Sequence, residues 1–287
     1  MAELRIGTCS WKYDSWKGLI YPESSKINFL KEYTAHYNTV EIDQWFWSLH
    51  ANGKIALPKR NVVEIYNSST PEDFKFTIKT PNSITLTHPY SKSKNSLGNP
   101  NEYFLSCNLF KTFLETLESI KSKIGMLMFQ FEYLNKQKMR SLFYFEGLFS
   151  TFIKNCPENF NYAMEIRNPN YLNESYFRFL NENNLHHVFA EGYYMPKIFN
   201  VYEKYRDFIK NKTVIRLLGP NRKGIEQKTE GKWNKIIEPK DTELMQIVKM
   251  IKDLLSREVD VYLNVNNHYE GSAPLTIKKI NNLLEQF

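Results

Sequence analysis

The chain has 287 residues, of which 42% are hydrophobic and 24% charged, a composition that is typical of a globular protein and excludes a disordered or collagen-like chain. The odd set Cys9, Cys107 and Cys156 has no CxxC spacing, which excludes a disulfide framework and a zinc knuckle. The net charge of +7 leaves nucleic acid and anionic metabolites open as partners. No apolar run approaches membrane-spanning length, so we expect a cytoplasmic protein without a membrane partner.

Short apolar runs alternate with helix-like stretches along the whole chain. Each run is too short for a helix and ends near polar residues, which is typical of buried parallel strands. We predict strands at residues 4–9, 39–43, 74–79, 126–131, 162–167, 186–190, 213–217 and 259–266.

Helices are expected between these strands. Ser24 or Ser25 can cap the first, which would run to about residue 37, and Pro58 suits the first turn of the second, at about 58–67. The breaker-rich segment 80–100 is expected to be a functional or lid-like loop, and the basic stretch 221–235 a solvated loop. Further helices are predicted at about 105–120, 136–154, 173–183, 201–210 and 241–255, and after residue 274.

This order of elements indicates an α/β protein that forms a single TIM-like (β/α)8 barrel over residues 1–287, either regular or as an irregular or seven-stranded variant. No linker, internal repeat or low-complexity tract divides the chain. No G-x-G-x-x-G motif follows the first strand, which argues against a dinucleotide fold, and we predict no redox cofactor.

Polar side chains near the strand ends are expected to gather inside the barrel mouth. Residues two apart in a strand share a face, so Val40 and Ile42 would pack against helices and leave Glu41 inside. The same rule places other polar residues inside: Asp43, Thr77, Lys79, Gln130, Glu165, Arg167, Arg216, Asn264 and Asn266.

The three carboxylates and three cations in this set permit two interpretations. In the first, the charges pair as a satisfied ionic network that closes the barrel end. In the second, Arg167 and Arg216 hold an anionic substrate. Glu165 or Glu41 then acts as general base, and Lys79 stabilises developing negative charge. The remaining predicted substrate-binding residues are Asp43, Gln130, Asn266, His268, Trp11 and Tyr13.

Three further features leave alternatives open. The imidazole of His268 could act as an acid or base, or could order the loop after the last strand. Four tryptophans near the start could be core residues or a stacking wall for a ligand: Trp11, Trp16, Trp45 and Trp47. A divalent metal is the less favoured alternative, because nearby cations oppose its candidate ligands, which are Glu41, Asp43, Glu165 and His88.

Several motifs recur in the order of one known family. They are Ile6-Gly7-Thr8-Cys9-Ser10-Trp11, Asn38-Thr39-Val40-Glu41-Ile42-Asp43, Phe74-Lys75-Phe76 with Lys79, Gln130-Phe131, Glu165-Ile166-Arg167, Arg216 with Gly219, and Asn266-Asn267-His268-Tyr269. In these motifs the chain resembles the YecE-like proteins, also called domain of unknown function 72. The resemblance implies a barrel related to the TIM type and no established activity.

The chain departs from the family pattern at three places. The resemblance gives asparagine where Asp43 stands and a Thr-Phe-Tyr-like segment where Trp45-Phe46-Trp47 stands. It also gives histidine where Leu218 stands. If that histidine serves chemistry in the family, the activity of this member is lost or altered.

The leading functional hypothesis is an enzyme of hydrolase, lyase or isomerase type that acts by acid/base chemistry on a small anionic, for example phosphorylated, metabolite. One alternative is a nucleic-acid-processing or nucleic-acid-binding protein, because cations and clustered aromatic rings suit phosphates and bases. Another is a non-catalytic metabolite-binding or scaffold protein, which the departure at Leu218 favours. The sequence indicates no oligomeric state.

Overall fold

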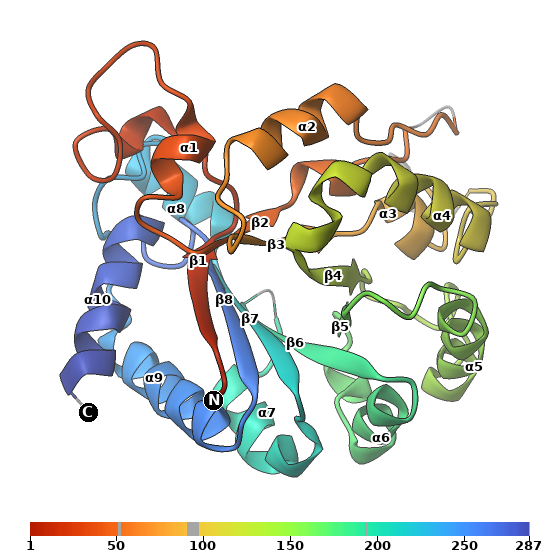
Figure 1. Ribbon diagram of the computed structural model, residues 1–287. Helices are drawn as coiled ribbons and strands as arrows, with labels where there is room; N and C mark the ends of the chain where they lie inside the picture. The colour runs from red at the N-terminus through yellow and green to blue at the C-terminus, as the bar shows by residue number, and fades with distance from the viewer. Residues whose placement is uncertain (51–52, 91–97, 193, 287) are drawn as a thin grey trace.

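The computed structural model describes residues 1–50, 53–90, 98–192 and 194–286. In these residues eight parallel strands wind into a nearly closed barrel with helices on its outside (Figure 1). The predicted TIM-like barrel is therefore confirmed. The strands are β1 (Leu4–Thr8), β2 (Thr39–Ile42), β3 (Lys75–Lys79), β4 (Ile124–Gln130), β5 (Tyr162–Glu165), β6 (Leu185–Gly192), β7 (Lys212–Gly219) and β8 (Asp260–Val265).

Helices cover the outside of the barrel and connect the strands. The α-helices are α1 (Phe29–Tyr33), α2 (Arg60–Ser68), α3 (Asn82–Thr85), α4 (Cys107–Thr116), α5 (Leu142–Ile153), α6 (Glu174–Glu182), α7 (Ile198–Tyr205), α8 (Arg222–Thr229), α9 (Asp241–Ser256) and α10 (Ala273–Gln286). Short 3-10 turns are η1 (Asp14–Trp16), η2 (Gln44–Phe46), η3 (Glu118–Lys123), η4 (Pro169–Tyr171) and η5 (Arg206–Phe208).

Several predicted helix boundaries were wrong because another residue makes the cap. Asn28 caps α1, where its Oδ1 accepts a hydrogen bond from the backbone of Lys31, so α1 starts after both predicted serines. Ser141 caps α5 in the same way. Pro58 precedes α2 by two residues and does not lie in its first turn.

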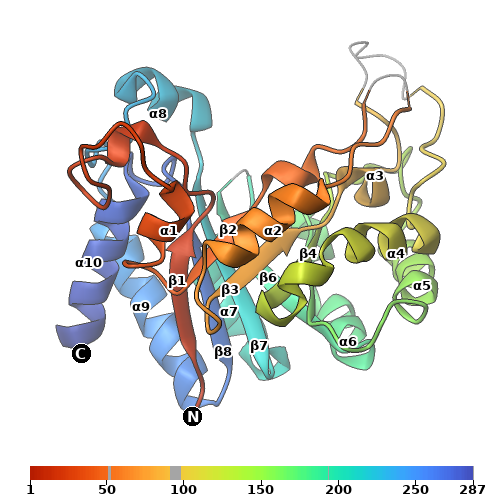
Figure 2. The ribbon, with the colours of Figure 1, turned by 45° about the horizontal axis from the view of Figure 1, so that its top comes forward.

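The basic stretch 221–235 was also predicted wrongly. Asn221 accepts a hydrogen bond from the backbone of Gly224 at 3.0 Å and thereby caps a helix, α8, over Arg222–Thr229. Figure 2 shows α8 at the end of the barrel opposite the N-terminus, which is the end where the strands finish. A helix with basic residues therefore lies beside the barrel mouth.

The barrel closes irregularly between β1 and β2. These strands share only an isolated bridge between Cys9 and Glu41, whereas all other neighbours form ladders. Side chains complete the seam instead, because the Tyr33 hydroxyl accepts from the backbone of Thr8 at 2.8 Å and donates to the carbonyl of Thr39 at 3.0 Å. A Cβ on Gly7 would lie 1.9 Å from that carbonyl oxygen, so only glycine fits there.

Side chains of alternating strand positions fill the barrel interior, as the period of two predicts. Below the mouth lies an apolar layer that is separate from the outer core: Met126, Met128, Ala163, Val188, Val214 and Tyr262. The neighbouring positions Val40, Ile42, Phe76 and Ile78 pack outward in the core between strands and helices. Glu165 and Arg216 lie two positions after Ala163 and Val214 of this layer, toward the strand ends. Together with Glu41 on β2 they are buried.

The described part of segment 80–100 is packed against the protein at its start, whereas residues 98–100 are exposed. Residues 80–87 are buried and include α3, and Asn101 donates hydrogen bonds of 2.7 Å to the carbonyls of Ser83 and Leu86. Residues 91–97 of the predicted lid-like loop lie outside the described residues. No helix in the described ranges combines the length and apolar character that a membrane span needs.

Candidate functional site

A cavity of about 1060 Å³ opens at the C-terminal ends of the strands. This is the end at which TIM barrels carry their active sites. Its wall is formed by Asp43, Phe46, Trp47, Lys79, Tyr90, Gln130, Tyr133, Arg167, Pro169, Asn170, Tyr194, Arg216, Leu218, Arg222 and Asn266.

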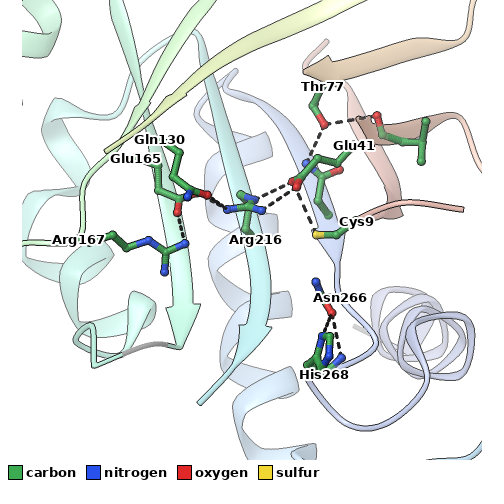
Figure 3. A network of polar contacts seen from close by, with 11 residues as sticks. Cys9, Glu41, Thr77, Gln130, Glu165, Arg167, Arg216, Asn266 and His268 are labelled. Carbon is green, nitrogen blue, oxygen red and sulfur yellow. Dashed lines mark hydrogen bonds and ion pairs between the residues drawn. The ribbon is translucent and has the colours of Figure 1, made fainter. Parts of the chain in front are cut away.

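Arg216 is the centre of a buried ionic network at the base of this cavity (Figure 3). Its guanidinium binds Glu41 in a bidentate manner, with Nε 2.7 Å from Oε2 and Nη2 2.6 Å from Oε1. Nη1 donates to Glu165 and, at 3.3 Å, to Oε1 of Gln130. Glu165 also forms an ion pair with Arg167. Five predicted site residues, four of them on β2, β4, β5 and β7 and Arg167 just after β5, are thus joined in one cluster.

The network fixes the charge states of its members. Burial opposes ionisation of Glu165, but Arg167, Arg216 and Lys79 outweigh this effect and lower its pKa from 4.5 to about 2. Burial likewise opposes the charge on Arg216, yet Glu165 and Glu41 raise its pKa well above the ordinary value. Neither glutamate lines the cavity. Glu165, a buried carboxylate that is paired with arginine and has a lowered pKa, is poorly suited to act as general base.

Asp43 and Lys79 differ from these residues because both line the cavity without an ion pair to any described residue. Burial and the nearby Arg216 lower the pKa of Lys79 from 10.5 to about 8, against the attraction of the carboxylates around it. Its ammonium lies 3.9 Å from the centroid of the Phe46 ring. Burial, followed by Glu41, raises the pKa of Asp43. Both groups are therefore shifted toward neutral pH, as catalytic acids and bases often are.

The other predicted substrate-binding residues divide into two groups. Gln130, Arg167 and Asn266 line the cavity, whereas Trp11, Tyr13 and His268 do not. Trp11 is buried and packs edge-on against Tyr66, with ring centroids 5.1 Å apart. The ring of Tyr13 packs on Trp16 at 4.7 Å.

His268 makes contacts within the loop after β8 and to α8. Its Nδ1 lies 2.5 Å from Oδ1 of Asn266, and its Nε2 lies 3.0 Å from Oε1 of Glu226 on α8. The ring also packs on Trp233, with centroids 4.8 Å apart. Burial lowers the pKa of His268, although the hydrogen bond to Glu226 opposes this effect. His268 thus fastens α8 to the strand end that carries Asn266.

The sequence reasoning missed most of the aromatic side chains at the cavity. Of the four early tryptophans, Trp11, Trp16 and Trp45 are buried, and Trp47 alone lines the cavity. Tyr90, Tyr133 and Tyr194 join it from loops that follow other strands. Their common signal is an aromatic residue within a loop that follows a strand, a pattern too frequent to identify a site by itself.

Neither a metal ion nor a cysteine nucleophile at Cys9 is favoured by the geometry of the described residues. Within it, no group of three or more His, Cys, Asp or Glu side chains is placed to hold a metal ion, and Nδ1 of His88 instead lies 3.1 Å from Oγ1 of Thr87. Cys9 is buried with its Sγ 3.6 Å from Oε2 of Glu41, and burial followed by Glu41 raises the pKa of this thiol. Such a thiol is a weak nucleophile.

Known proteins share both the sequence pattern and the fold of this chain. Residues 5–287 match the family described as "Protein of unknown function DUF72". The UPF0759 protein YunF of Bacillus subtilis is 26% identical over 98% of this chain and 94% of its own length. Crystal structures of DUF72 family proteins from Enterococcus faecalis and Thermotoga maritima align with TM-scores of 0.68 and 0.66. The Enterococcus protein is 18% identical, and the alignment covers 98% of this chain and 95% of that chain. The Thermotoga protein is 24% identical, and the alignment covers 99% of both chains. The chain therefore belongs to the DUF72 family of proteins of unknown function.

Proposed function

We propose that this protein is an enzyme that acts by acid/base chemistry on a small anionic substrate, with Asp43 as the proton-transferring carboxylate and Lys79 as the cation that holds the substrate. The proposal is carried by one observation: these two side chains face the same cavity and stand outside the ionic network. Barrel mouths are the usual place for such sites.

The charge states of the two groups support these roles. Lys79, with a pKa of about 8, is mainly protonated at neutral pH and has no carboxylate of the described chain within ion-pair distance. It is thus available to bind an anion or to stabilise negative charge that develops in the reaction. The raised pKa of Asp43 makes this carboxylate a better base than Glu165 and allows it to return the proton as an acid.

The ionic network would then act through position rather than proton transfer. Glu41 and Glu165 hold the guanidinium of Arg216 from two sides, and Glu165 also holds Arg167 at the cavity wall. A fixed guanidinium can orient a substrate without reorganisation during the reaction. Gln130 and Asn266 supply amide groups to the same cavity.

The experiment begins with thermal unfolding in the presence of phosphate esters, carboxylates and inorganic phosphate. A ligand at a hundred times its dissociation constant adds about 2.7 kcal/mol, which corresponds to a rise of several degrees in Tm. Compounds that bind are then assayed for turnover with the wild type, Asp43→Asn and Lys79→Met. We expect Asp43→Asn to lower kcat by about 10²-fold or more and Lys79→Met mainly to weaken binding.

The control is Arg178→Met, which removes an exposed ion pair with Glu174 on α6, and neither residue lines the cavity. Unchanged kcat in Asp43→Asn would overturn the role of Asp43. Since the family resemblance gives asparagine at this position, the same variant tests whether the carboxylate chemistry is particular to this chain.

A metabolite-binding protein without turnover is the second candidate, because of Leu218. Its side chain is buried at the cavity wall and packs with Cys9 and Ala190, where the family resemblance gives histidine. Tight binding of a compound that the wild type does not convert, weakened by Lys79→Met, would favour this candidate over the enzyme.

A further inference from the structure

Exposed aromatic rings are concentrated around the cavity. Trp47, Tyr90, Tyr133 and Tyr194 are 59%, 55%, 59% and 99% exposed, and all four line it. They follow four different strands, β2, β3, β4 and β6, so their convergence is a property of the fold and not of one aromatic stretch of sequence. We call these four residues the aromatic rim.

An exposed ring has a large apolar face in contact with water, and its burial by a ligand is favourable. Single exposed rings are common on protein surfaces, but several around one concave site are typical of a binding surface. Trp47 and Tyr90 are neighbours, with ring centroids 6.1 Å apart and planes inclined by 45°. They provide two adjoining aromatic faces, inclined to each other, at one side of the cavity mouth.

This surface continues directly to a cation. Trp47 contacts Phe46 edge-on, with centroids 5.2 Å apart, and the ammonium of Lys79 lies 3.9 Å from the centroid of the same Phe46 ring. Arg167 and Arg222 also line the cavity. A ligand that occupies this path therefore meets aromatic faces at its outer end and positive charge at its inner end.

The size of the cavity adds a constraint. Small-molecule sites commonly enclose about 300–1,000 Å³. The volume here, about 1060 Å³, exceeds what inorganic phosphate or a short linear phosphate ester would fill. A ligand that fills it extends from the charged base to the aromatic rim.

We propose that the cavity binds a phosphate ester that carries a ring, with one face of the ring packed on Trp47 and the phosphate held at Lys79. This inference rests on the proposed function for the position of the anion, and it adds the substrate class. The ring is either a sugar or a nucleobase, since both present a face that stacks on tryptophan.

The test is calorimetric titration with three probes: adenosine monophosphate, glucose 6-phosphate and glycerol 3-phosphate, the last of which has no ring. At least one ring-bearing probe should bind about fivefold or more tightly than glycerol 3-phosphate. Adenosine monophosphate as the tighter probe would identify a nucleobase, and glucose 6-phosphate a sugar.

Variants of Trp47 test whether the aromatic rim causes this difference in affinity between the probes. Trp47→Ala should reduce binding of the ring-bearing probe to the level of glycerol 3-phosphate, whereas Trp47→Tyr should retain most of it. The matched control is Phe143→Ala, because Phe143 is an aromatic residue on α5 that is 84% exposed and does not line the cavity. This variant should bind like the wild type.

Several outcomes would overturn the inference: equal affinity for all three probes, no effect of Trp47→Ala, or no binding of either ring-bearing probe at millimolar concentration. Equal affinities that Lys79→Met weakens would overturn the aromatic rim alone and leave the proposed function in place. Conversely, ring-dependent binding together with unchanged turnover in Asp43→Asn would contradict the proposed function and leave the rim.

Discussion

Removal of Arg216 is the strongest perturbation that the structure offers. The guanidinium contacts Glu41 twice, Glu165 once and Gln130 once, and it is buried together with both glutamates. In Arg216→Met, the apolar chain of the side chain is retained while Glu41 loses its only ion pair among the described residues. Breaking a buried ion pair on one side typically destabilises a protein by about 3–5 kcal/mol. In a chain of this length, Tm should fall on the order of 10 °C.

The pH dependence of this loss identifies its cause. The pKa of Glu165 is about 2 in the folded protein and 4.5 as the ordinary value. Its ionised form therefore contributes stability that is present above about pH 4.5 and is lost as the pH falls toward 2. At 1.36 kcal/mol per pKa unit, this contribution is at most about 3 kcal/mol. In Arg216→Met the pKa of Glu165 rises, so the variant should lose less stability than the wild type between pH 5 and pH 3.

The assay is urea unfolding of both proteins at a series of pH values, followed by circular dichroism. Arg178→Met is the control, because Arg178 and Glu174 form an exposed pair on α6 and such pairs contribute about 0.5 kcal/mol or less. If Arg216→Met is no more destabilising than Arg178→Met, or if its stability changes with pH as that of the wild type does, the reasoning from a buried network is refuted.

Three further predictions concern single positions. The pKa of Lys79 is about 8 in the folded protein and 10.5 as the ordinary value, so the unfolded state binds more protons between pH 8 and pH 10.5. The free energy of unfolding should therefore rise with pH in this range, by up to about 3 kcal/mol, and urea unfolding of Lys79→Met should lack this rise. Gly7→Ala should destabilise the folded protein by about 1–3 kcal/mol or more, because the added Cβ would meet the carbonyl of Thr39. Gly147→Ala in α5, where a Cβ has open space, should not destabilise it, and thermal unfolding of both variants tests the difference. Cys9 should resist alkylation in the folded protein and react after unfolding, as mass spectrometry can measure, since burial raises the pKa of its thiol.

The direction in which strand side chains point could be predicted from the sequence, because it follows a local rule. In a parallel strand the side-chain period is two, and an apolar residue on either side of a charge fixes which way the charge points. Glu41 between Val40 and Ile42 illustrates this, since both neighbours pack outward and the carboxylate lies inside the barrel. The helix starts were less predictable, because Asn28 competes with nearby serines for the same capping role and local sequence does not decide between them.

The partners of the inward charges could not be predicted, because they depend on distances across the closed barrel. Arg216 and Glu41 are 175 residues apart in sequence, yet the guanidinium spans the interior from β7 to contact β2. A count of three carboxylates and three cations is equally compatible with three separate pairs. Only the assembled barrel shows that one guanidinium engages two glutamates.

Because of this unequal pairing, we expect the residues that stabilise the barrel mouth to differ from those of the proposed acid/base site. Arg216 binds both glutamates, so each of these buried carboxylates has a cationic partner without a ligand, and the base of the cavity is already formed in the free protein. Asp43 and Lys79 remain at the cavity surface, and replacement of either leaves no buried ion partner uncompensated. Variants at Arg216 should therefore lose stability and function together, whereas Asp43→Asn and Lys79→Met should lose function in a protein that remains folded. Equal losses of stability in both groups would mean that Asp43 and Lys79 belong to the network, and the acid/base proposal would then lack its foundation.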